Sequence, residues 1–196
     1  MTVIQSLTHP RVLLLTALYF LMACGSYGFE LWLPEIVKSL SGASNFRVTL
    51  LTAIPYLVGT FVMVWVAHHS DRTGERRWHV ALSALVAGVG FSAGAYLKNP
   101  VLALGALTVA WAGVKALHGP FWALPPAFLS GTGAAAGIAL INSVGNLGGL
   151  VGPWVAGALR KGTDSFTAGL WVSGALLFVM AFASLKIPRR ISGPQA

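Results

Sequence analysis

The residue with the clearest chemistry in this sequence is Lys115, which lies inside a long apolar run over residues 101–124. If that run crosses a membrane, a charge at its centre costs about 2.5–3.5 kcal/mol, so charges at such positions tend to be functional. Trp111 and His118 share one helix face with Lys115 because they lie four residues before it and three after it. An ammonium group there would attract a small carboxylate. The alternative is that Lys115 reaches back to the lipid headgroups, about 13 Å away at 1.5 Å per residue.

Two asparagines, Asn142 and Asn146, form a second polar feature in the apolar run over residues 134–159. Their spacing of four residues places them on one helix face, which Gly149 and Pro153 continue. Asn142 lies about 12 Å from the start of its run by the same helical rise, close to the expected depth of Lys115. We therefore expect both asparagines to donate hydrogen bonds to the ligand of Lys115. The alternative is hydrogen bonding between helices, worth about 0.6 kcal/mol on average.

One acidic residue, Glu30, lies near the end of the first apolar run, four residues before Pro34. It is a candidate coupling carboxylate, and the alternative is a solvated group at the membrane rim. The three histidines beside the basic loop form no convincing metal-ligand set with Asp71, so we expect them to be solvated interface residues. They are His68, His69 and His79.

The elements that position these residues follow from composition. Of the 196 residues, 56% are hydrophobic and only 9% are charged, whereas soluble domains have about 25% charged residues. Six runs have the length of about 20 residues that a helix needs to cross ~30 Å of hydrocarbon. These runs are 12–33, 48–68, 78–97, 101–124, 134–159 and 167–186. The sequence therefore predicts an all-α, polytopic membrane protein with six transmembrane helices.

The basic residues predict the orientation, since cytoplasmic loops carry an excess of lysine and arginine. Six crossings place both termini on one side. That side would carry Arg11, Arg72, Arg76, Arg77, Lys186, Arg189 and Arg190, and the other Lys38, Arg47, Lys98, Arg160 and Lys161. We expect a cytoplasmic segment over 1–11, a membrane domain over 12–187 and a cytoplasmic tail over 188–196, in the inner membrane. The net charge of +8 lies between apolar runs and not on one face, so no nucleic-acid partner is expected.

The loop between the second and third runs has a recognisable pattern. It reads Ser70-Asp71-Arg72-Thr73-Gly74-Glu75-Arg76-Arg77. This resembles the D-R-x-G-R-[RK] loop that follows the second helix of each six-helix half in major facilitator superfamily transporters. The resemblance implies that the acid and the arginines bridge neighbouring helix ends on the cytoplasmic face, around Gly74. Glu75 stands where an arginine is usual, and the alternative is an ordinary basic turn.

A longer pattern narrows the resemblance to one branch of that superfamily. It comprises Gly119-Pro120-Phe121-Trp122-Ala123-Leu124-Pro125, the stretch 134–149 with Asn142-Ser143-Val144-Gly145-Asn146-Leu147-Gly148-Gly149, and Gly152-Pro153. With Tyr27-Gly28 ahead of Trp32-Leu33-Pro34, it resembles the anion:cation symporter family, which includes phthalate- and tartrate-type transporters. The glycines also form two small-xxx-small pairs, Gly145 with Gly149 and Gly148 with Gly152, which allow helices to approach closely in lipid.

The resemblance implies the C-terminal six-helix half of a secondary active symporter. Its substrate would be a small organic anion such as a tartrate- or phthalate-like carboxylate, moved with H⁺ or Na⁺. The partners would be membrane lipid and the missing N-terminal half, and Tyr19, Tyr27 and Tyr56 would supply hydroxyl groups to the cavity between the halves. No cofactor, metal or enzymatic activity is expected, because no nucleophile elbow, zinc-protease motif or P-loop is present.

Three other interpretations stay open at this point. The first is a remnant that does not transport. The second is a half-transporter that works as a homodimer. The third is a structural or interaction protein of the membrane. The opening residues 1–7 read like part of a loop between two halves, as expected for a fragment.

Overall fold

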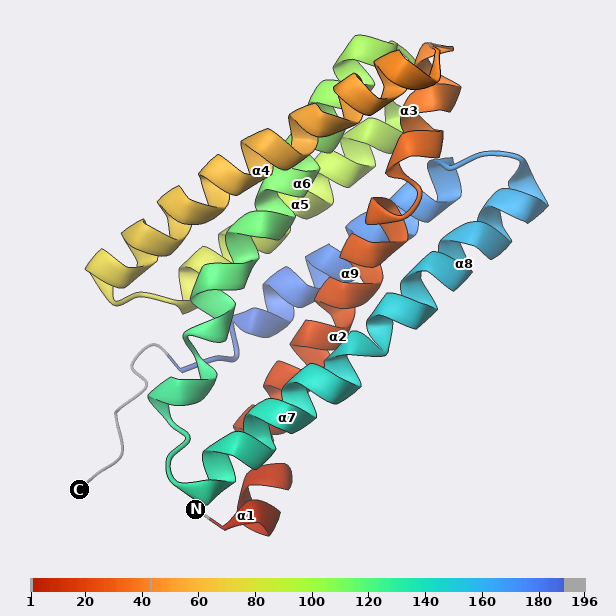
Figure 1. Ribbon diagram of the computed structural model, residues 1–196. Helices are drawn as coiled ribbons and strands as arrows, with labels where there is room; N and C mark the ends of the chain where they lie inside the picture. Colours follow the sequence, from red (N-terminus) through yellow and green to blue (C-terminus); the bar gives the residue numbers. More distant parts are fainter. Residues whose placement is uncertain (1, 43, 189–196) are drawn as a thin grey trace.

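The computed structural model describes residues 2–42 and 44–188, which form helices joined by short loops (Figure 1). Six stretches are long and apolar enough to cross a membrane. They are α2 (Pro10–Glu30), α4 (Asn45–Thr73), α5 (Arg77–Tyr96), α6 (Pro100–Trp122) with the 3₁₀ turn η1 (Pro125–Ala127), α7 (Thr132–Asn146) with α8 (Gly148–Thr163), and α9 (Thr167–Ser184). The predicted all-α fold with six membrane helices is confirmed. Arg189 and Arg190 of the expected tail lie outside the described residues.

Two short helices lie outside the predicted crossings. The segment α1 (Val3–Leu7) precedes the first crossing, and α3 (Leu33–Ser41) occupies most of the stretch expected to be a loop. Pro34 lies in the first turn of α3, where a missing N–H costs nothing, and Gly42 ends the helix with φ of 60°. Ile36 and Val37 are buried, so α3 packs across the end of the bundle rather than leaving it.

The fifth crossing is divided at Leu147, between α7 and α8. There the Leu147 N–H donates to the Val144 carbonyl oxygen at 3.2 Å, and the Leu150 N–H donates to the Leu147 carbonyl oxygen at 3.0 Å. These bonds span three residues, as in a 3₁₀ turn. The adjacent glycines Gly148 and Gly149 account for the break, since glycine pairs are common sites of helix kinks.

The helices pack in the order α4, α6, α5, α9, α2 and then α7–α8, so that α4 and α7–α8 lie at the two edges (Figure 1). The core between them is aromatic. Phe29 of α2 contacts Phe91 of α5 and Trp111 of α6, with ring centroids 5.0 and 5.7 Å apart. This contact brings α2 close to α6 although the two helices share little of their length. The edge helices α4 and α7–α8 are the least buried crossings.

The two ends of the bundle are held by different contacts. The helix α1, the end of α9 and the α4–α5 loop lie at one end, which we call the terminal end (Figure 1). At the opposite end, the guanidinium of Arg160 lies over the rings of Trp32 and Phe166, at 5.2 and 4.4 Å from their centroids. It is also 3.7 Å from the carboxylate of Glu35. These four residues, the Arg160 cluster, connect the end of α8 to the α2–α3 corner and to the start of α9.

Candidate functional site

A small polar pocket of about 40 Å³ lies between α2 and α6. Its lining alternates between these helices because residues at helical spacing share a face. The lining residues are Tyr19, Met22, Ala23, Ser26, Tyr27 and Glu30 from α2, and Trp111, Val114, Lys115 and His118 from α6. We call this the Lys115 pocket. Its volume holds a few water molecules and not a whole organic anion, so any such ligand needs a further wall.

The ammonium of Lys115 has an aromatic neighbour and no ionic partner among the described residues. Its Nζ lies 4.4 Å from the centroid of the Trp111 ring. The ion pairs within 4.0 Å in residues 2–42 and 44–188 all lie elsewhere. Gly59 of α4 makes room for this arrangement, since a Cβ there would lie 3.1 Å from both Lys115 Cγ and Trp111 Cδ1. Sequence reasoning missed Gly59, because the contact joins residues 56 positions apart.

The carboxylate of Glu30 lies in the same pocket and also lacks an ion pair within the described part of the chain. Glu30 is partly buried, so it is not a fully solvated rim group. Tyr56 of α4 lies close enough to Glu30 to interact with its charge, and its ring meets the Trp111 ring edge-on at 5.5 Å. The pocket therefore holds one positive and one negative side chain that do not neutralise each other by direct contact.

His118 is oriented by its own helix. Its Nδ1 lies 3.0 Å from the Val114 carbonyl oxygen, so Nδ1–H donates to that oxygen and Nε2 stays available as an acceptor. An ammonium one turn away opposes a second positive charge on this ring. Lys115 and His118 therefore place two basic side chains on the same wall of the pocket.

Asn142 and Asn146 lie outside the Lys115 pocket. Both are exposed on α7, and Asn146 Nδ2 donates to the backbone and side-chain oxygens of Asn142, each at 2.9 Å. The helix α2 lies between α7 and α6, and its Tyr19 interacts with the Asn146 side chain while lining the pocket. The asparagines and Lys115 thus flank Tyr19.

The two glycine pairs of the fifth crossing serve different purposes. A Cβ at Gly148 or Gly152 would collide with backbone atoms of α2, among them the Phe20 and Cys24 carbonyl oxygens. Here the absence of side chains permits close approach of two backbones. Gly145 and Gly149 instead make room for the rings of Tyr19 and Tyr27. Pro153 lies on the same helix as Gly152, one residue beyond the closest approach.

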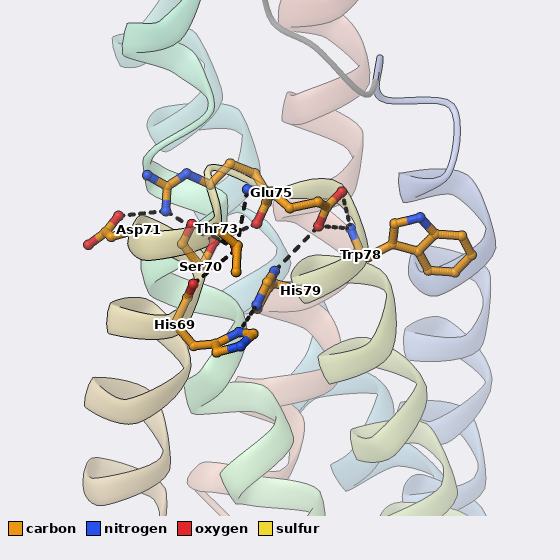
Figure 2. A network of polar contacts seen from close by, with 8 residues as sticks. His69, Ser70, Asp71, Thr73, Glu75, Trp78 and His79 are labelled. Atoms are coloured by element: carbon orange, nitrogen blue, oxygen red, sulfur yellow. Dashed lines mark hydrogen bonds and ion pairs between the residues drawn. The ribbon is translucent and has the colours of Figure 1, made fainter.

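The α4–α5 loop forms a compact polar network at the terminal end (Figure 2). Gly74 has φ of 66° and ends α4. The guanidinium of Arg76 is 2.5 Å from the Asp71 carboxylate and donates to Ser70 Oγ at 3.0 Å. Arg77 donates to the Leu185 carbonyl oxygen at 3.3 Å, which connects α5 to the end of α9.

The remaining loop residues show what the unusual glutamate does. Arg72 is exposed. Glu75 accepts hydrogen bonds from the Trp78 N–H at 2.8 and 3.0 Å, so its carboxylate caps the start of α5 (Figure 2). Its Oε2 is also 3.3 Å from His79 Nδ1, and His79 Nε2 is 2.7 Å from His69 Nδ1. Two of the three interface histidines thus pair with each other, and no group of three metal ligands occurs in the described residues.

Comparison with known proteins places this geometry in context. Residues 2–153 match the family model described as Major Facilitator Superfamily. Relatives include two proteins of Agrobacterium vitis, each named "Putative tartrate transporter". One is 41% identical over 195 residues, covering 100% of this chain and 43% of the relative, and the other is 40% identical over 188 residues, covering 96% and 43%.

A third relative has a different name. It is the "Quinolone resistance transporter" of Acinetobacter baumannii, 40% identical over 190 residues, covering 93% of this chain and 44% of the relative. The chain thus spans less than half the length of the curated relatives it matches. All three are named as transporters and none as an enzyme.

Proposed function

The chain belongs to the major facilitator superfamily, and on that premise we propose that it is the C-terminal six-helix half of a secondary active transporter for a small organic anion. The loop at 70–77 and the pattern through α6, α7 and α8 support the choice of half, because both resemble second-half segments of anion:cation symporters. The tartrate-transporter names of two relatives support the substrate class. In this fold the substrate lies near the bilayer midplane between the two halves.

One observation carries the proposal: the ammonium of Lys115 lies in a polar pocket near the middle of α6, with an aromatic ring as its closest described neighbour. A charge at this depth is costly unless an anion arrives to balance it. At low dielectric, the attraction between an ammonium and a carboxylate is several times that in water. Binding therefore offsets the desolvation of Lys115 and favours the loaded conformation.

Glu30 is the proposed coupling carboxylate. The charges of Lys115 and Glu30 cancel, although the two residues make no direct ion pair in the described part of the chain. A bound carboxylate adds a negative charge, which a cation taken up at Glu30 would restore to neutrality. The coupling ion is then H⁺ or Na⁺, with Lys115, His118, Tyr19, Tyr27 and Tyr56 as the charged and titratable neighbours of Glu30.

The missing half is proposed to cover the edge helices α4 and α7–α8. Both carry large apolar side chains that are exposed in the described structure, including Phe61, Trp65, Leu150 and Trp154, each about 70% exposed or more. Asn142 and Asn146 lie on the same open side of α7, where uncovered polar groups would meet lipid at a cost. A second half would give the Lys115 pocket its further wall.

We also propose that the terminal end faces the cytoplasm and that the membrane is the inner membrane. The arginines of the α4–α5 loop support this orientation by the positive-inside bias. A tag placed in the α4–α5 loop of intact cells should stay unreactive toward an impermeant reagent. Labelling of that tag from outside would reverse the assigned orientation.

The decisive experiment measures the binding and uptake of tartrate by a chimera. In this chimera, the chain replaces the matching segment of the 41% identical Agrobacterium vitis relative. Lys115→Ala should abolish detectable tartrate binding and uptake while membrane insertion and the melting temperature stay at parent values. Lys98→Ala is the matched control, since Lys98 is exposed in the loop between α5 and α6. Lys115→Arg should also bind poorly, because a guanidinium and an ammonium differ in shape and hydration.

The same chimera tests coupling. Glu30→Gln should bind tartrate but lose uptake driven by an ion gradient, whereas Glu35→Gln in the Arg160 cluster should keep it. If Lys115→Ala binds tartrate as tightly as the parent, Lys115 is a structural residue and the anion site lies on the other half. If Glu30→Gln stays fully driven by the gradient, another group carries the coupling ion.

A further inference from the structure

The indole N–H of Trp111 is a buried donor that this half of the molecule leaves unused. Trp111 has no exposed surface, and its Nε1 has no hydrogen-bond partner among the described atoms. Most buried polar groups in proteins are hydrogen-bonded, so an unused one calls for an explanation. Leaving a buried donor unsatisfied costs about 1–3 kcal/mol. The other groups that line the Lys115 pocket and carry polar atoms do not supply an acceptor to it.

The position of this N–H ties it to Lys115. Trp111 lines the Lys115 pocket, and its ring lies under the lysine ammonium. Lys115 Cγ and Trp111 Cδ1 are both 3.1 Å from the site of a Cβ at Gly59. Because Cδ1 is bonded to Nε1, the stem of the lysine and the edge of the indole that carries the N–H lie beside the same glycine. Lys115 and the N–H edge of Trp111 thus both face Gly59 of α4.

The ammonium lies over the face of the Trp111 ring, whereas the unpartnered N–H lies at the edge of the same ring. An incoming carboxylate attracts the ammonium, and the indole N–H then offers a second donor beside it. A carboxylate has two oxygens, and hydrogen bonds of about 2.9 Å to each allow it to reach both donors at once. The neighbouring rings of Phe29 and Tyr56 fix the orientation of Trp111, with centroids 5.7 and 5.5 Å away.

We propose that the Trp111 indole N–H donates a hydrogen bond to the carboxylate held by Lys115. Trp111 would then contact the lysine ammonium through its ring face and the anion through its N–H. The inference rests on the proposed anion-binding function of this pocket. It adds a specificity-determining residue, because an N–H that must be satisfied favours a ligand with an acceptor oxygen over an apolar one of the same size.

The test replaces the N–H and keeps the ring. Two variants of the chimera are made. In one, Trp111 is exchanged for benzothienylalanine, which has the shape of tryptophan with sulfur in place of the N–H. The other is Trp111→Phe. Both should weaken tartrate binding by about 10- to 100-fold, the loss expected for a hydrogen bond to a charged group. Trp171→Phe is the matched control, since Trp171 is about half exposed on α9, and it should leave binding unchanged.

A spectroscopic reading separates binding from packing. With ¹⁵N-labelled tryptophan, the indole signal that disappears in Trp111→Phe should shift downfield on tartrate addition, and the Trp171 signal should not. A parent-like affinity in the benzothienylalanine protein, or a Trp111 signal that does not move, overturns the inference and assigns the N–H to a water molecule. If Lys115→Ala does not weaken binding either, the proposed function itself fails.

Discussion

The Lys115 pocket and the Asn142–Asn146 pair are both polar features of membrane helices, but their polar groups are satisfied in opposite ways. In the pocket, Lys115, Glu30 and the Trp111 N–H are fully or partly buried and make no hydrogen bond or ion pair within the described chain. On α7 the asparagines are exposed, yet the side-chain amide of Asn146 already donates hydrogen bonds to Asn142. Polar residues at similar depth therefore differ in what they can still bind.

Whether a polar group already has a hydrogen-bond or ionic partner predicts its contribution to binding better than its residue type does. A group that already has its partner gains little from a ligand, because binding only exchanges one hydrogen bond for another. A buried group without a partner has already lost its hydrogen bonds to water, so a ligand that supplies a partner offsets the whole of that desolvation cost. The comparison thus assigns most of the binding energy to the pocket and a smaller share to the amide of Asn142, whose own N–H₂ donates no hydrogen bond among the described residues.

The contrast between the Lys115 pocket and the asparagine pair would fail most clearly if this chain transported tartrate without the other half. We expect the isolated chain to show no saturable tartrate uptake after reconstitution, because its pocket of about 40 Å³ is too small and its Asn pair faces lipid. The chimera, measured in the same liposomes, is the positive control. Uptake by a purified monomer of this chain would contradict the expectation, and uptake by a dimer would support a homodimer of halves.

The two asparagines sharpen the comparison from the other side. Asn142→Ala should weaken tartrate binding in the chimera by about 3- to 10-fold, the range for a neutral hydrogen bond, and Asn146→Ala by about twofold or less. The reason is that Asn146 Nδ2 is occupied by Asn142. Isothermal titration of both variants measures the ratio. An equal or reversed order would show that the pair rearranges when the other half is present.

The smallest expected effect concerns Gly59, which shapes the pocket without lining it. Gly59→Ala should weaken binding by a few-fold, since its Cβ would press on Lys115 Cγ and Trp111 Cδ1 at 3.1 Å and the stem must shift. Gly105→Ala on α6 is the matched control, because nothing lies within 4 Å of a Cβ there. Parent-like affinity in Gly59→Ala would mean that the lysine stem adjusts at no cost.

Much of the pocket follows from local spacing, and this explains which residues the sequence predicts. Tyr19 and Glu30 share a face of one helix, and Lys115 and His118 share a face of another, so their grouping needs only the helical period. Gly59 and the unused N–H of Trp111 depend on how α4 meets α6. Contacts between distant segments have no signature in one sequence, so these two could not be predicted.

The fold shows the same division. The six crossings are predictable because length and hydropathy define them. The helix α3 was missed because its 9 residues are too few to cross and a search for crossings treats them as a loop. Glu75 appeared as a departure from the loop pattern, and its role as a cap of α5 became visible only with the Trp78 N–H beside it.

The break at Leu147 divides the fifth crossing into two short rods. The rod α8 is anchored at its far end by the Arg160 cluster, while α7 packs on α1 and α2 at the terminal end. A continuous helix is nearly rigid, so its tilt would be the same at both ends. The 3₁₀ turn at Leu147 instead allows each segment to follow the contacts at its own end of the bundle.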